Sequence, residues 1–196
     1  MRSRLRFLFS SAAAFLIPAL AWAHPGHPGH EVEWDFQAGA VHPLSGLDHV
    51  LAMVAIGLWA AQLGGRARWL VPSAFVAMMV AGGVLGRFGG EVPALEQAIA
   101  ASAVILGLLI ALAIRPPVIL GMVVAGTFAL FHGYAHGAEM PENSSATMYV
   151  LGFVAATITL HLVGLGLGLA ASRLPSAVSK VAGWAVAACG IYLFAV

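Results

Sequence analysis

The chain has 196 residues, of which 61% are hydrophobic and 9% are charged, and its mean hydropathy is +0.93. A water-soluble domain of this length needs more polar surface, so the composition indicates an integral membrane protein in a lipid bilayer. The net charge is +1, and the scattered Lys and Arg residues argue against a nucleic-acid partner. A single cysteine, Cys189, excludes an internal disulfide.

The first 23 residues have the order of a secretory signal peptide. Arg2, Arg4 and Arg6 precede an apolar run that ends at Leu20, and Ala-Trp-Ala follows. We therefore expect residues 1–23 to be a cleaved signal peptide, with His24 as the first residue of the mature chain. An uncleaved first helix is the alternative interpretation.

Residues 24–41 are predicted to form a periplasmic, His-rich N-terminal segment. His24, His27 and His30 alternate with Pro-Gly pairs, a composition that is typical of short metal-binding tracts. Such a segment could capture metal ions outside the membrane. The alternative is a leader in which the histidines are incidental.

Residues 42–196 are predicted to form an all-α bundle of six transmembrane helices, because about 20 apolar residues cross a bilayer. The predicted spans are 42–63, 69–87, 95–114, 117–137, 147–170 and 178–196. Alternate loops carry five positive charges and no acid, at Arg66, Arg68, Arg115, Arg173 and Lys180. By the positive-inside rule, these loops are cytoplasmic and both mature ends are periplasmic, in a bacterial inner membrane.

Ionisable residues gather near the periplasmic ends of two spans, where burial in the bilayer makes them candidates for a functional site. The first cluster begins span one and the second ends span four. The candidate metal ligands are His42, Asp48, His49, His132, His136 and Glu139. Because both clusters lie in the periplasmic half, we expect them to face each other and to bind one divalent transition metal.

Helical spacing predicts how these side chains are arranged. His132 and His136 are four residues apart, and Glu139 follows three later, so the three should share one helical face. His42 and His49, seven apart, should share a face as well, with Pro43 in the first turn of their helix. Asp48 lies about 100° around that helix, so it is expected to orient a histidine rather than to bind metal directly.

Two further residues are weaker candidates for the metal site or its path. Glu96 begins the third span, where an acid also complements the helix dipole. His161 lies deep in the fifth span and nearer the cytoplasmic side, where it is either a relay on the exit path or a packing residue.

At these two clusters the chain resembles the HupE/UreJ family of hydrogenase and urease accessory permeases. The pattern His-Pro-x-x-Gly-x-Asp-His matches from His42 to His49, and Phe-His-Gly-x-Ala-His-Gly-x-Glu matches from Phe131 to Glu139. The resemblance covers the whole chain. It implies uptake of Ni²⁺, in some members Co²⁺, as cargo rather than as a prosthetic group, an indirect link to nickel-enzyme maturation, and no enzymatic activity.

The ligands alone leave other interpretations open. Nickel, cobalt, zinc and Cu(II) all accept imidazole and carboxylate donors. A membrane-embedded His/carboxylate metalloenzyme and a bis-His haem protein would use the same side chains. Glycines at helical spacing, such as Gly133 and Gly137, indicate close helix packing within the bundle, with homo-oligomerisation or a hinge as the alternatives.

Overall fold

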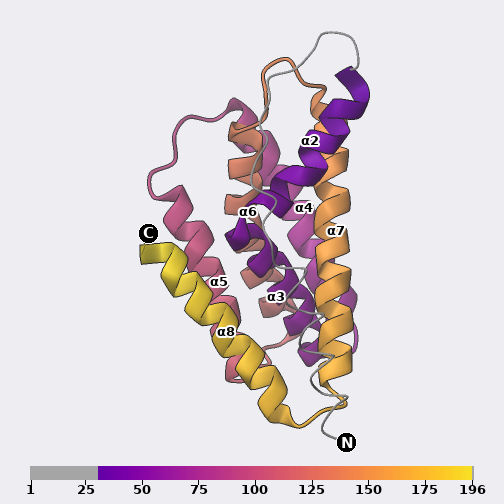
Figure 1. The fold of residues 1–196 in the computed structure, drawn as a ribbon, viewed down its shortest axis with the longest axis vertical. Coiled ribbons are helices and arrows are strands. Elements are labelled where there is room, and N and C mark those ends of the chain that lie inside the picture. The colour runs from indigo at the N-terminus through magenta and orange to yellow at the C-terminus, as the bar shows by residue number, and fades with distance from the viewer. Residues whose placement is uncertain (1–30, 196) are drawn as a thin grey trace, which may run out of the picture.

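The computed structural model describes residues 31–195. The predicted signal peptide and the His24, His27 and His30 tract therefore lie outside the described residues. Within residues 31–195 the chain forms seven helices and no strand (Figure 1). They are α2 (Glu31–Ser45), α3 (Leu47–Leu63), α4 (Ala67–Phe88), α5 (Leu95–Ala111), α6 (Val118–Ala138), α7 (Ala146–Ala171) and α8 (Ser176–Ala195).

Four of these helices, α4, α6, α7 and α8, are long and apolar enough to cross a bilayer on their own. The segment Asp35–Ser45 and helix α3 pass the same test together, but they are bent by 83° at the break between them. Helix α5 is apolar but has only 17 residues. By length and composition, the described residues thus provide four membrane crossings, or five with the bent pair, compared with the six spans expected.

Helix α3 lies inside the bundle and contacts most of the other helices. Its side chains Ala52, Ile56 and Trp59 are completely buried. The outer faces of the surrounding helices instead expose large apolar side chains, such as Ile119 and Leu162. Helices with an apolar exterior around a buried core are what a lipid environment requires.

Helices α4 and α6 pack through glycines, as the sequence predicted. A Cβ atom on Gly133 would overlap the carbonyl oxygen of Met79, and one on Gly137 would overlap the carbonyl oxygen of Gly83. Glycine is therefore required for the close approach of these two backbones. This contact fixes the C-terminal end of α6, which carries the second cluster, against α4.

The first predicted span is not one continuous helix, which corrects the shared-face prediction for His42 and His49. The chain breaks at Gly46, whose backbone is extended (φ −96°, ψ 120°), and Pro43 lies in the last turn of α2 rather than in the first turn of the next helix. The Ser45 hydroxyl donates a hydrogen bond of 2.7 Å to the carbonyl of His42. His42 and His49 are therefore on different helices.

Helix α2 is held against α7. A Cβ on Gly152 would overlap the carbonyl oxygen of Phe36, and one on Gly39 would overlap that of Tyr149. The backbone N–H of Ser145 also donates a 2.6 Å hydrogen bond to a carboxylate oxygen of Asp35. Residues 31–41, which the sequence placed in the N-terminal segment, thus belong to a helix that packs on the bundle.

Candidate metal site

Four imidazole rings meet where α2, α3 and α6 adjoin. His136 lies at the centre, with its ring centroid 4.8 Å from that of His42 and 4.8 Å from that of His49. His49 is also 5.0 Å from His132 and 6.4 Å from His42. The structure therefore brings the two sequence clusters together, although the 83° bend, and not a shared helical face, places His42 beside His49.

The orientation of the His49 ring is set by its neighbour in the chain. Nδ1 of His49 lies 2.9 Å from a carboxylate oxygen of Asp48, which also accepts the backbone N–H of His49 at 2.8 Å. A carboxylate accepts hydrogen bonds, so Nδ1 carries the proton in the neutral ring. The other nitrogen, Nε2, then has a free lone pair, and it is buried without a hydrogen-bond partner.

His132 has the same arrangement with a different acceptor. Its Nδ1 donates a hydrogen bond of 2.9 Å to the carbonyl of Phe128, one turn earlier in α6. A carbonyl can only accept, so the neutral ring again has its lone pair on Nε2. That atom is buried and unpartnered, and the side chain is completely buried.

These two Nε2 atoms are the chemically informative feature of the site. A buried polar atom without a partner costs free energy, so native proteins rarely contain one without a reason. In metal-binding histidines, one ring nitrogen usually donates its hydrogen to a carboxylate or carbonyl oxygen. The lone pair of the other nitrogen is then free to bind the metal ion.

His136 has two unpartnered ring nitrogens, both of them buried. Its ring is stacked on Phe153 of α7, with a centroid distance of 5.2 Å and an interplanar angle of 9°. The stacking fixes the plane of the ring without using either nitrogen. His136 therefore places two unpartnered nitrogens between His42 and His49, and in the neutral ring one of them has the lone pair that can bind a metal ion.

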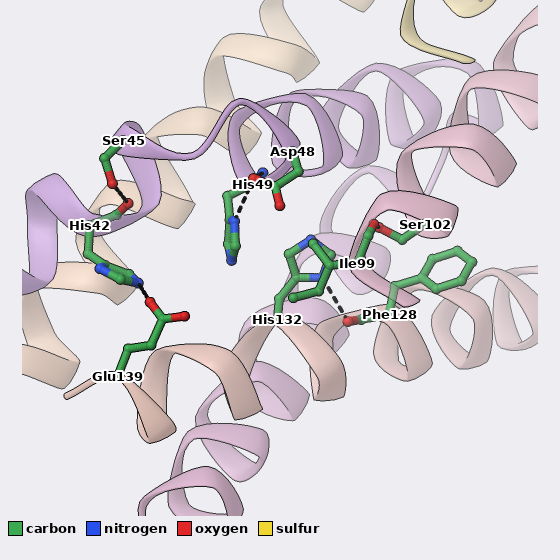
Figure 2. Close-up of polar contacts among 9 residues, drawn as sticks. All are labelled: His42, Ser45, Asp48, His49, Ile99, Ser102, Phe128, His132 and Glu139. Carbon is green, nitrogen blue, oxygen red and sulfur yellow. Dashed lines mark hydrogen bonds and ion pairs between the residues drawn. The ribbon is translucent and has the colours of Figure 1, made fainter. Parts of the chain in front are cut away.

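His42 and Glu139 form the outer part of the cluster. Nε2 of His42 lies 3.0 Å from a carboxylate oxygen of Glu139, and the Glu139 side chain is 53% exposed. Figure 2 shows the two side chains facing each other across α2 and the end of α6. This pair joins the buried histidines to the surface at this end of the bundle.

The six candidates are gathered, but they are not arranged as a coordination shell. Within residues 31–195, no group of three or more His, Cys, Asp or Glu side chains is placed so that it could hold a metal ion. The rings contact one another edge to face or tilted, and His42 is paired with Glu139. Several rings would have to rotate before their nitrogens could converge on one ion.

The two weaker candidates are not part of this cluster. Glu96 is exposed at the start of α5. His161 is buried in α7, and the ring of Phe75 from α4 contacts both His132, at 5.8 Å, and His161, at 5.0 Å. His161 is thus linked to the four-His cluster only through the ring of Phe75, which contacts them both.

Sequence reasoning missed the aromatic residues that surround the cluster. Tyr149 lies 6.2 Å from His42 and 6.0 Å from Phe153, and its hydroxyl is buried without a partner. Phe75 and Phe153 contact His132 and His136, respectively. Tyr149 and Phe153 are four residues apart in a predicted helix, so their common face was a usable signal, but nothing in the sequence indicated which helix it met.

Fold and site together define a polytopic helical membrane protein in which buried histidines and two more exposed carboxylates gather near one end of the bundle. The profile of the family described as HupE / UreJ protein matches residues 12–193. The chain belongs to this family of hydrogenase and urease accessory proteins, which are not enzymes.

A curated relative supports the same assignment. The chain is 48% identical to "Protein HupE" of Rhizobium leguminosarum bv. viciae over 186 residues, which covers 94% of this chain and 95% of the relative. No solved structure matches the chain.

Proposed function

We propose that this protein is an inner-membrane permease that imports a divalent transition metal, nickel or cobalt, for the maturation of a nickel enzyme such as hydrogenase or urease. The observation that supports it most strongly is the pair of buried, unpartnered Nε2 atoms on His49 and His132. Imidazole nitrogens with the opposite nitrogen held by an acceptor suit nickel, cobalt and zinc alike. Family membership favours nickel among them.

In this proposal, the exposed Glu139 and its partner His42 receive the ion from the periplasm. The ion then passes to His136, which contacts both His42 and His49, and on to His132. Each step replaces water ligands with imidazole nitrogens. A divalent cation moving inwards gains about 4.6 kcal/mol per 100 mV of membrane potential, twice the single-charge value.

The membrane topology belongs to the same proposal. We assign six crossings, formed by α3 with its bent neighbour α2 and by α4 to α8. Helix α5, with 17 residues, is at the lower limit for a transmembrane helix. The basic residues Arg66, Arg68, Arg115, Arg173 and Lys180 would face the cytoplasm, and the four-His cluster would face the periplasm.

The His24, His27 and His30 tract would capture metal near the entrance, because it directly precedes α2. A tethered ligand raises the local metal concentration without forming part of the route. Deleting residues 24–30 should therefore reduce uptake at scarce metal and leave the saturated rate nearly unchanged. Loss of transport at saturating metal would instead place this tract within the transport route.

Uptake into proteoliposomes with an inside-negative potential tests the proposal directly. Nickel, cobalt and zinc are each supplied outside, and the metal inside is counted for the unmodified protein, His49→Ala, His136→Ala and the control Glu142→Gln. Glu142 is exposed, in the loop that follows Glu139. We expect both His variants to lose most uptake and the control to retain it.

Normal transport by both His variants would refute the shared metal site. Absence of uptake by the unmodified protein, with nickel still bound in detergent, would argue for a metal-holding accessory role instead of a permease. An absorption spectrum of the purified protein adds a further control, because a Soret band would favour the bis-His haem alternative.

A further inference from the structure

A pocket on the outside of the bundle, distinct from the four-His cluster, lies between α4 and α7. Its volume is about 370 Å³, which is within the range of small-molecule sites. Its lining includes Arg68, Trp69, Ser73, Ala77, His161 and Leu162. Trp69 is 63% exposed and Leu162 is 52% exposed, so the pocket opens on the surface that faces lipid.

Two side chains of this pocket, Arg68 and His161, have buried nitrogen atoms that could donate hydrogen bonds but have no acceptor within the protein. His161 is only 3% exposed, and neither of its ring nitrogens has a hydrogen-bond partner. Nε of Arg68 is also buried and unpartnered. A guanidinium, a hydroxyl from Ser73 and an imidazole N–H together suit a ligand with several acceptor oxygens.

A metal ion fits this pocket poorly. The permanent positive charge of Arg68 repels a cation, and no carboxylate lines the pocket. Most of the lining is apolar, including Val76, Ile158 and Leu165. The chemistry therefore favours an occupant with an anionic, oxygen-rich end and a hydrocarbon part.

The pocket runs along α4 from the basic end of the bundle. Arg68 and Ala77 are nine residues apart on α4, which corresponds to about 14 Å along a helix. The basic residues Arg66, Arg68, Arg115, Arg173 and Lys180 lie in or next to the loops at this end, and these loops contain no acid. An exposed tryptophan beside an arginine is typical of the level at which lipid headgroups lie.

We propose that this pocket binds one anionic phospholipid of the bilayer leaflet at the basic end of the bundle. The lipid phosphate pairs with Arg68 beside the Trp69 indole. Ser73 and His161 donate hydrogen bonds to oxygens of the glycerol esters, and an acyl chain lies over Ala77 and the apolar residues of α7. This occupant satisfies the buried donors that the protein itself leaves unpaired.

Lipid retention by the purified full chain tests this site. The protein in detergent is titrated with phosphatidylglycerol or with phosphatidylcholine of the same acyl chains, and bound lipid is counted by native mass spectrometry. We expect one phosphatidylglycerol molecule to bind at least about tenfold more tightly than phosphatidylcholine, because the quaternary ammonium group of phosphatidylcholine cancels the negative charge of its phosphate and is repelled by Arg68.

Three variants separate the pocket from general attraction to the basic surface. Arg68→Gln removes the positive charge that pairs with the lipid phosphate, and Ala77→Phe fills the acyl-chain site from an exposed position without altering charge. Each should weaken phosphatidylglycerol binding by about tenfold or more. Arg173→Gln removes a charge at the same end but outside the pocket lining, and it should leave binding unchanged.

Three results would overturn the proposal. Equal loss in Arg173→Gln would mean that lipid binds to the charged surface alone. Unchanged binding in Ala77→Phe would place the acyl chain elsewhere. Displacement of the lipid by millimolar inorganic phosphate would identify a free-anion site instead. All three readouts are independent of metal transport, so they stand whether or not the permease proposal holds.

Discussion

At the scale of single residues, hydrogen bonds to Nδ1 determine what the buried histidines can do. Asp48 holds Nδ1 of His49, and the Phe128 carbonyl holds Nδ1 of His132. Both rings therefore have an unpartnered Nε2 inside the protein. The sequence predicted an orienting role for Asp48 from its offset on the helix, but the acceptor for His132 is a backbone atom, which no side-chain pattern can indicate.

The first prediction concerns Asp48. In Asp48→Asn the amide can present either its oxygen or its NH₂ group to His49, so the proton position on the ring is no longer fixed. We expect nickel binding by the purified protein, measured by equilibrium dialysis, to weaken by about 10–100-fold, the usual cost of removing such an orienting partner. Glu142→Gln serves as a carboxylate control, and an affinity equal to that of the control would contradict the orienting role.

At the scale of elements, the break between α2 and α3 brings His42 to the other histidines. Gly46 separates two helices that differ in direction by 83°. The sequence contained the break signals, Pro43 and Gly46, but its apolar periodicity favoured one continuous span. The structure shows two helices rather than one span, because α2 packs against α7 through Gly39 and Gly152 and therefore does not continue in the direction of α3.

The second prediction is that Gly46→Ala impairs the site and not the fold. The backbone at Gly46 is extended (φ −96°, ψ 120°), so alanine can adopt it. The added Cβ would lie 2.6 Å from a carboxylate oxygen of Asp48 and 2.9 Å from Nδ1 of His49, so this pair must shift. We expect weaker nickel binding with an unchanged thermal unfolding midpoint. Gly90→Ala, in open space, is the matched control.

A large fall in the unfolding midpoint of Gly46→Ala would mean that this glycine is needed for the helix break itself. Nickel affinity equal to that of Gly90→Ala would mean that the Asp48 and His49 pair can shift without consequence. The first result would contradict the predicted unchanged stability, and the second would contradict the predicted loss of nickel binding.

The third prediction concerns the contact between α4 and α6. In Gly137→Ala the new Cβ would overlap the backbone of Gly83, which cannot move aside as a side chain can. We expect destabilisation of about 1–3 kcal/mol, the usual cost of overpacking, measured as a lower unfolding midpoint in detergent. Gly166→Ala places its Cβ in open space and should be neutral or slightly stabilising. Equal midpoints for the two variants would show that this contact is looser than the structure indicates.

At the scale of the whole molecule, charge is distributed unevenly between the two ends of the bundle. The charged residues of the loops that contain Arg66, Arg115 and Arg173 are all basic, while Glu139 and Glu142 lie at the opposite end, beside the four-His cluster. Such an asymmetry sets the orientation of a membrane protein during insertion. In the proposed topology, the pocket at His161 and the four-His cluster would lie in opposite leaflets.

The fourth prediction tests this orientation with reporter fusions. Fusions after residues 66, 115 and 175 should report the cytoplasm, and those after residues 90, 142 and 196 should report the periplasm. A reporter after residue 115 also tests α5 separately, because this 17-residue helix must cross the membrane to place Arg115 inside. Two or more reversed reporters would overturn the orientation, and the metal cluster would then face the wrong compartment for uptake.

The sequence by itself determined the membrane class and the positions of the apolar helices from α4 to α8, and it proposed six candidate site residues. Hydropathy and motif spacing are local properties, so they can be read without the fold. The tertiary structure decided the bend at Gly46, the aromatic walls from Tyr149, Phe75 and Phe153, and the separate pocket at His161. These depend on which helix faces meet, and the close glycine contacts that select those faces arise only between segments distant in the chain.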